Sequence, residues 1–222
     1  MTTANAPALL FVPTDLDPEH EAAVNRWYDE RHVPQRQALP GFLSARRYVA
    51  FSGGPKYAAL YDLESPEALK TDAYKALSQP PIQTAEDKEM VSRFKNNMRC
   101  VMTQILQAGR ETAPSPDEAK GLLVVSLEPQ EGYEEEYNAW YDDEHIPYII
   151  KVPGVLRARR FRGVEGPLRY LAVYELTAPE VRQSAAFSEA AETPWTWRMR
   201  EHCNRPITAV YQPLPVPATQ RG

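Results

Sequence analysis

Several features are scarce in this 222-residue sequence, and each scarcity excludes a class of protein. Two cysteines, Cys100 and Cys203, are too few for a disulfide framework or a structural zinc site. No run of Lys or Arg exceeds two residues and the formal net charge is -5, which argues against a nucleic-acid or anionic-membrane partner. No apolar run approaches the ~20 residues of a membrane span, and the first residues lack the pattern of a signal peptide. We therefore expect a cytoplasmic protein.

The motifs of several common cofactor and hydrolase sites are also missing. The sequence has no glycine-rich phosphate loop and no G-x-S-x-G, C-x-x-C or H-E-x-x-H motif. Its four histidines do not gather with enough cysteines or carboxylates to predict a metal site. The sequence therefore predicts no cofactor and no metal, with a small molecule as the substrate or ligand.

An internal repeat is the strongest feature that is present. Residues 27–34 (Trp-Tyr-Asp-Glu-Arg-His-Val-Pro) recur at 140–147 as Trp-Tyr-Asp-Asp-Glu-His-Ile-Pro, an offset of 113. Over residues 27–67, 18 of 41 positions are identical at this offset, which indicates a tandem duplication. Later the offset falls to 105, which aligns Thr103 with Thr208 and Gln107 with Gln212 and leaves eight extra residues in the first copy.

Both copies predict the same order of elements. In the first copy, apolar runs at 9–12, 42–51, 56–63 and 101–107 indicate strands. One helix is expected from Pro18 to about Pro34, and a second, with breaks at residues 80–81, from 66 to about 99. The order βαββαβ is the ferredoxin-like arrangement, so the fold class is α+β. We expect a first half at 1–108, a linker at 109–120, a second half at 121–212 and a tail at 213–222, as a monomeric pseudo-dimer or a homodimer.

The first helix of each copy carries the same polar stripe. At about 100° per residue, four positions fall on one face of the helix. They are Asn25, Tyr28, Asp29 and His32 in the first copy, and Asn138, Tyr141, Asp142 and His145 in the second.

The spacing of the stripe predicts acid–base chemistry. Asp29 and His32 are three residues apart, so the carboxylate is expected to fix the imidazole tautomer and raise its basicity. The histidine is then a general base or acid, and the tyrosine a donor to an oxyanion. The competing interpretation is that the histidine caps the helix and the aspartate only orients it. Glu144 is expected to raise the pKa of His145 and Arg31 to lower that of His32, which favours the second half as the more active.

Two further sets are candidate substrate-binding residues, together with Asn25 and Asn138. Arg46 and its equivalent Arg159 each precede a second arginine on a strand, so one side chain of each pair points toward the helices and the other is available to the contact between halves. The alternative is that both are exposed to solvent at an edge of the sheet. Trp195 and Trp197 occur only in the second copy and are candidates for an aromatic wall, although burial in the core is the alternative.

The motif Trp-Tyr-Asp-x-x-His-x-Pro, followed by a Pro-Gly turn and an Ala-Arg-Arg strand, resembles the dimeric α/β-barrel superfamily and, within it, the EthD-like proteins. The resemblance covers about 8–108 and 121–212. Because most members have one such half and dimerise, it implies a fused dimer. It also implies a pocket between helices and sheet in each half, with His32 and His145 at the walls.

Three functions fit these observations. The first is a cofactor-independent lyase, dehydratase or isomerase acting on a small, largely apolar carbonyl or phenolic compound. The second is a monooxygenase, either cofactor-free or haem-dependent. The third is a non-catalytic small-ligand-binding protein. We expect the first.

Overall fold

The computed structural model describes residues 6–214 and shows two halves with the same order of elements. The first half comprises β1 (Ala8–Thr14), α1 (Pro18–Trp27), η2 (Tyr28–His32), α2 (Val33–Gln37), β2 (Phe42–Gly54), β3 (Tyr57–Leu63), η3 (Pro66–Lys70), α3 (Asp72–Ala76), α4 (Ala85–Ser92) and β4 (Cys100–Gly109). The second half comprises β5 (Gly121–Pro129), α5 (Glu134–Trp140), η4 (Tyr141–His145), α6 (Ile146–Ile149), β6 (Val155–Glu165), β7 (Tyr170–Leu176), η5 (Pro179–Gln183), α7 (Ala185–Ala191), α8 (Pro194–Glu201) and β8 (Cys203–Pro213).

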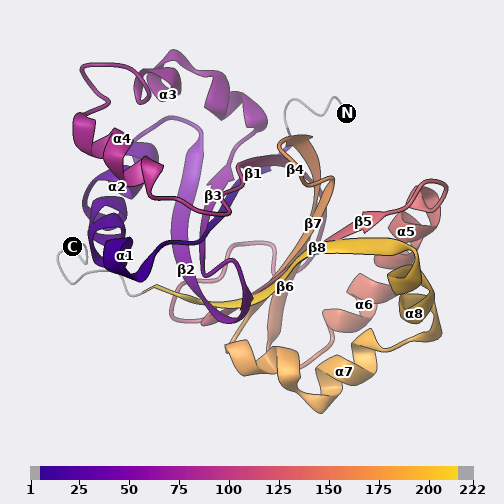
Figure 1. The fold of residues 1–222 in the computed structure, drawn as a ribbon. Coiled ribbons are helices and arrows are strands. Elements are labelled where there is room, and N and C mark those ends of the chain that lie inside the picture. The colour runs from indigo at the N-terminus through magenta and orange to yellow at the C-terminus, as the bar shows by residue number, and fades with distance from the viewer. Residues whose placement is uncertain (1–5, 215–222) are drawn as a thin grey trace.

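The strands form one closed antiparallel barrel (Figure 1). Their order is β1-β3-β2-β8-β5-β7-β6-β4, so each half supplies four adjacent strands. The halves join edge to edge, β2 with β8 and β4 with β6. Closure removes the exposed sheet edges that would otherwise pair with other chains. The predicted α+β pseudo-dimeric barrel of two ferredoxin-like halves is confirmed.

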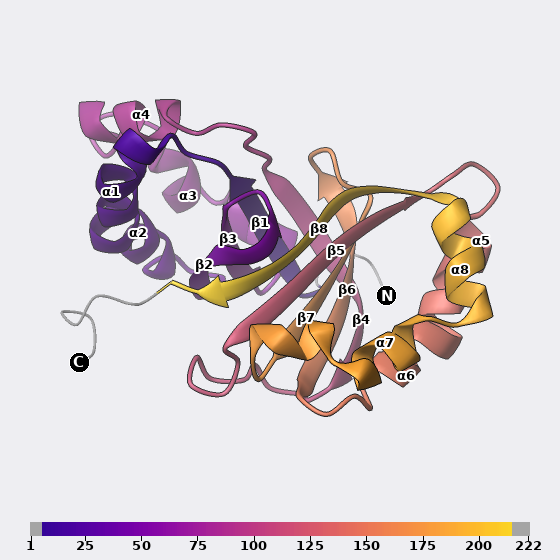
Figure 2. The ribbon, with the colours of Figure 1, turned by 60° about the horizontal axis from the view of Figure 1, so that its bottom comes forward.

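Three apolar cores follow from this arrangement. The barrel interior is filled by side chains from both halves, among them Phe11, Tyr48, Phe161 and Tyr211. Outside the barrel, the helices of each half cover the outer face of their own strands on opposite sides (Figure 2). Because only two short seams and the barrel interior join the halves, each helix–sheet layer is free to differ from its counterpart. None of the helices within residues 6–214 has the length and apolar character of a membrane span.

The strand register corrects the predicted alignment of the last strand. Leu10 pairs with Val101 in the first half and Leu123 with Val210 in the second, so the offset falls from 113 to 109 and not to 105. The first copy therefore has four extra residues, and the helix positions place them between α3 and α4. The Thr and Gln identities that suggested 105 are coincidental, since strand pairing decides equivalence.

The first helix of each half continues past the proline at which we predicted its end. A π-helical turn, η2 or η4, precedes Pro34 or Pro147, and the N–H of Val33 bonds the carbonyl of Tyr28 across it. The proline then falls in the first turn of the next α-segment, where no N–H is needed. The second helical region of the first half is also more broken than predicted, because a capping box at Thr84 starts α4 anew after the proline pair.

Candidate functional site

The stripe residues converge on an arginine of the neighbouring strand in each half. In the first half, Arg47 donates to the Asp29 carboxylate at 2.8 Å and to the Asn25 side chain, and its guanidinium lies 4.3 Å from the Tyr28 ring centre. We call this set, and its equivalent in the second half, the arginine clamps.

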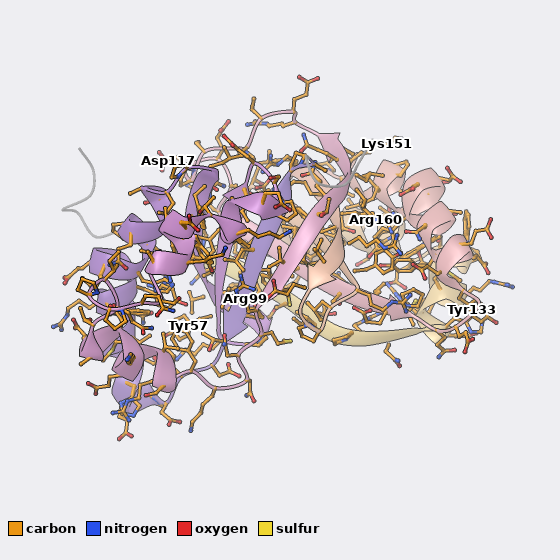
Figure 3. The ribbon with its side chains drawn as sticks, turned by 90° about the horizontal axis from the view of Figure 1, so that it is seen from above. Tyr57, Arg99, Asp117, Tyr133, Lys151 and Arg160 are labelled. Atoms are coloured by element: carbon orange, nitrogen blue, oxygen red, sulfur yellow. The ribbon has the colours of Figure 1, made fainter. Side chains whose placement is uncertain are left out.

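The second clamp repeats the first. Arg160 donates to Asp142 and, at 2.8 Å, to Asn138, and it lies 4.2 Å from the Tyr141 ring centre. Figure 3 shows Arg160 between the strands and the helices of this half. Its side chain is 2% exposed, so its charge needs these partners.

The clamps change the interpretation of the stripe. We predicted that each aspartate orients the histidine three residues later, but the hydrogen bonds of Asp142 go to Arg160, and Nδ1 of His145 has no partner. Asp29 likewise accepts from Arg47. Three of the four stripe residues therefore tie the helix to the sheet. Because a buried arginine needs these partners, the presence of the three residues in both copies is explained without a catalytic role.

The two histidines instead pack against tryptophan rings. His32 lies 4.4 Å from Trp27, and His145 lies 4.5 Å from Trp140, measured between ring centres. Burial, followed by the charges of Arg200, Arg160 and Arg182, lowers the pKa of His145 to about 3. Burial and Arg36 also hold the pKa of His32 well below its ordinary value. Both imidazoles are therefore uncharged at neutral pH.

We predicted a raised pKa for His145, and the direction of that prediction is wrong. Glu144 accepts a hydrogen bond from Thr193 and does not raise the pKa of His145. Arg31 is held by Asp87 at 2.7 Å, so the cation that most lowers the pKa of His32 is Arg36. Sequence neighbours did not predict the pKa of His145, because tertiary contacts bring Arg200 of α8 and Arg182 of η5 close to it.

A pocket adjoins His145 between the helices and the sheet of the second half. It has a volume of about 50 Å³. Aromatic and aliphatic side chains wall it, while Arg182, Arg200 and Arg205 line it with positive charge; the other lining residues are Leu123, Val125, Leu127, Trp140, Tyr141, Tyr174, Phe187, Ala191, Thr196 and Thr208. We call it the His145 pocket.

Two polar atoms of this pocket are buried without a partner. They are Nδ1 of His145 and the hydroxyl of Tyr174, which has the Tyr141 side chain as a neighbour; the equivalent hydroxyl of the first half, that of Tyr61, is unpartnered as well. Buried polar groups are nearly always hydrogen-bonded, so unpartnered ones that line a hollow indicate a place for a ligand's polar atoms. Sequence reasoning missed Tyr174 and the three arginines. The repeat, which matches Tyr174 with Tyr61, was the one available signal.

The tryptophans of α8 lie elsewhere. Trp195 is half-buried and packs against the apolar core of this half, whereas Trp197 is 56% exposed beside Arg200. Neither is among the residues that line the His145 pocket, and Trp195 lies against the core, as the alternative expected. The helix instead presents Thr196 and Arg200 to the pocket.

Arg46 and Arg159 point away from the clamps and reach across the barrel. Arg159 bonds Asp62 of the other half at 2.6 Å, and Arg46 approaches Glu175 of the other half at 3.9 Å. These pairs are equivalent under the duplication. One arginine of each pair thus lies at the contact between halves, but these are Arg46 and Arg159, which we had assigned to the substrate; Arg47 and Arg160 are the ones that face the stripes.

A second, larger cavity of about 410 Å³ lies in the first half beside β2. Its polar lining includes Arg46, Arg47 and Asp29, which already bond one another or the backbone of Pro114. The polar groups of this cavity are therefore largely satisfied, unlike those of the His145 pocket.

Neither cavity fits haem. The His145 pocket is far below the roughly 300 Å³ at which sites for larger organic ligands begin. The larger cavity has room, but among the described residues its lining has no His, Cys or Met, and its one tyrosine, Tyr48, packs in the barrel interior, where burial raises the pKa of its hydroxyl to about 12. Asp17, Glu19 and His20 lie within 4.8 Å of one another, yet Lys95 pairs with Asp17 and Arg93 lies 3.2 Å from His20, so cationic side chains already occupy that cluster.

Comparisons with known proteins bear on the fold. No family model matches the sequence, and no curated protein matches it. An anthrone oxidase-like protein superposes with a TM-score of 0.71 at 9% identity, covering 95% of this chain and 92% of that one. A mutant chlorite dismutase from Candidatus Nitrospira defluvii, in complex with cyanide, has a TM-score of 0.60 at 10% identity over 97% and 93% of the chains. A monooxygenase-like protein from Listeria innocua has a TM-score of 0.54 at 8% identity over 96% and 98%.

Identities this low establish shared architecture and not shared chemistry. The EthD-like subgroup is not confirmed. With the closed barrel and the repeated halves, these likenesses identify the chain as a dimeric α/β-barrel fold built from a tandem duplication.

Proposed function

We propose that this protein is a cofactor-independent oxygenase that acts in the His145 pocket on a small, largely apolar phenolic or carbonyl compound. The observation that carries the proposal is the uncharged His145, whose buried Nδ1 has no partner, in the same pocket as the Tyr174 hydroxyl. A neutral imidazole with an open nitrogen is a proton acceptor.

The chemistry needs a base and stabilisation of an anion. His145 takes a proton from a carbon or oxygen of the substrate, and Tyr174 donates to the oxygen on which negative charge develops. The electron-rich anion then reacts with O2. When a methylene becomes a carbonyl, one oxygen atom enters the product and the other leaves as water with the two hydrogens, so four electrons balance. The clamp residues Asn138, Tyr141 and Asp142 position the helix that carries His145.

The small volume restricts how a substrate lies. About 50 Å³ is a third of the 150 Å³ engineered cavity that binds benzene. The enclosed part therefore receives the reacting end of the substrate, and the remainder extends past Arg205, which is exposed.

This proposal replaces the expected lyase or isomerase chemistry. That expectation depended on an Asp–His pair, and in the second half the aspartate bonds Arg160 instead. Fold relatives described as anthrone oxidase-like and monooxygenase-like support the oxygenase alternative, although at these identities they do so only by analogy.

The test is oxygen uptake by EDTA-treated protein with a panel of anthrones, hydroquinones and related phenols. We expect uptake coupled to quinone formation, from a colourless protein, and its loss in His145→Ala. His202→Ala is the control, since His202 stacks on Tyr133 and does not line the pocket. A requirement for haem, flavin or a metal, or uptake that His145→Ala leaves unchanged, would refute the proposal.

A further inference from the structure

The three arginines of the His145 pocket have no counterparts in the first half. The duplication aligns Arg182 with Leu69 at the offset of 113, and Arg200 and Arg205 with Val91 and Asn96 at the offset of 109. The 109 alignment is supported by a shared contact: the indole N–H of Trp27 donates to Asp87, and that of Trp140 donates to Thr196, the equivalent residue. The cationic lining is therefore a property of one copy and not of the fold.

Acidic side chains neutralise this cluster only in part. Arg200 pairs with Glu192 at 2.8 Å. Among residues 6–214, no ion pair reaches Arg182 or Arg205. Arg182 is half-buried against the Phe187 ring, 4.9 Å from its centre, where its charge is partly removed from water. Like charges held together at a partly buried site are unfavourable unless an anion joins them.

We propose that the His145 pocket selects substrates that carry a carboxylate, which Arg182 and Arg205 bind while the reacting end lies against His145 and Tyr174. Arginine forks match a planar carboxylate in bidentate geometry. This inference rests on the proposed function for the location of the site, but the binding it describes needs no turnover.

Binding of a carboxylate at the arginines also changes the basicity of His145. Burial lowers the pKa of His145 most, and the charges of Arg200, Arg160 and Arg182 lower it further. A carboxylate among these arginines opposes their effect, so His145 becomes a better proton acceptor when the substrate is present. The groups facing His145 from the surrounding elements are Arg160 on β6, Arg182 on η5, Arg200 on α8, and Tyr141 and Tyr174.

The experiment compares 4-hydroxybenzoate with 4-hydroxybenzamide, which differ in charge and little in size. Binding is measured by calorimetry under anaerobic conditions at low salt. We expect the carboxylate to bind at least about 10-fold more tightly than the amide, which corresponds to one charge-assisted contact. Arg182→Leu and Arg205→Asn should each reduce this preference, and the double variant should abolish it.

The variants are chosen to fold. Leucine and asparagine are the residues that the first half has at these positions. Arg198→Met is the matched control, because Arg198 lies on α8 between the two sites in sequence, is 59% exposed and pairs with Glu136 outside the pocket; it should keep the full preference. A thermal melt of each variant confirms folding.

Two outcomes overturn the inference: equal or absent binding of both compounds, or a preference that survives in the folded double variant. Failure of the proposed function is a separate result. If the carboxylate binds through the arginines but no member of the panel consumes oxygen, the oxygenase proposal fails and the carboxylate site stands. If oxygen uptake is equal for matched carboxylates and amides, the oxygenase proposal stands and the carboxylate site fails.

Discussion

The two halves share a scaffold and differ in what lies beneath their helices. Both keep the arginine clamp, the π-helical turn and the histidine on a tryptophan ring. In the first half, Asp87 accepts from the indole of Trp27 and pairs with Arg31, and Trp27 and Arg31 line a surface hollow of about 320 Å³. In the second, Thr196 replaces the acid and arginines line an open pocket. The comparison separates residues retained for folding from residues available for function.

The largest difference between the halves is expected in catalysis. His145→Ala should lower kcat by about 10²–10⁴-fold, the range for a lost acid–base group, because only His145 lines the pocket with a free nitrogen. His32→Ala should cost much less. The measurement is steady-state oxygen uptake with the best substrate of the panel, and equal losses in both variants would mean that the halves are functionally equivalent.

The clamps should matter for stability in both halves. Asp142→Ala leaves the Arg160 charge, with a side chain 2% exposed, poorly compensated and should destabilise the fold by about 3 kcal/mol. Asp29→Ala should cost less, since Arg47 is 8% exposed and closer to water. Urea unfolding of both variants checks this, with Asp143→Ala as the exposed control. If neither substitution changes the midpoint, the clamps are not structural.

The residues that accept a hydrogen bond from Trp27 and Trp140 should contribute different, smaller amounts to stability in the two halves. Asp87→Ala removes bonds to Trp27, Arg31 and the Thr84 cap, and should cost about 2 kcal/mol. Thr196→Ala removes the bonds that its hydroxyl accepts from Trp140 and Thr193, neither of them with a charged group, and should cost about 1 kcal/mol. Hydrogen bonds, above all the one from Arg31, lower the pKa of Asp87. The stability that this carboxylate contributes is therefore present above pH 3.8, its ordinary pKa, and is lost as the pH falls below that value. Glu86→Ala is the control, and a larger loss for Thr196→Ala than for Asp87→Ala would contradict the comparison.

The smallest difference between the halves is expected in the pH dependence of stability, because both histidines are buried and both pKa values are lowered. Burial lowers both pKa values in the folded state, so protonation favours the unfolded chain. The stabilising contribution is complete above about pH 6.5 and is lost as pH falls toward the folded pKa, at no more than about 1.4 kcal/mol per pH unit and histidine. Denaturation of wild type, His32→Phe and His145→Phe between pH 7 and 5 measures the slope, which should flatten in each variant.

Particular residues show which features the sequence predicted and which it did not. The repeat predicted the order of elements, and the paired arginines of the strand predicted one side chain toward the stripe. The partner of each aspartate was not predictable from spacing, because a π-helical turn changes which side chains meet. The pKa of His145 was not predictable either, because the charged residues that lower it most lie 15 to 55 positions away along the chain.

Sequence alone determined that two equivalent ferredoxin-like halves form, because the hydrophobic periods and turn residues are local properties present twice in the chain. Tertiary structure decided which half places a buried, unpartnered histidine nitrogen on a pocket. The pocket depends on the side chains that η5, α8 and β8 bring beside His145, and only the packing of these elements sets the distances, burial and electrostatic field that give the histidine its chemistry.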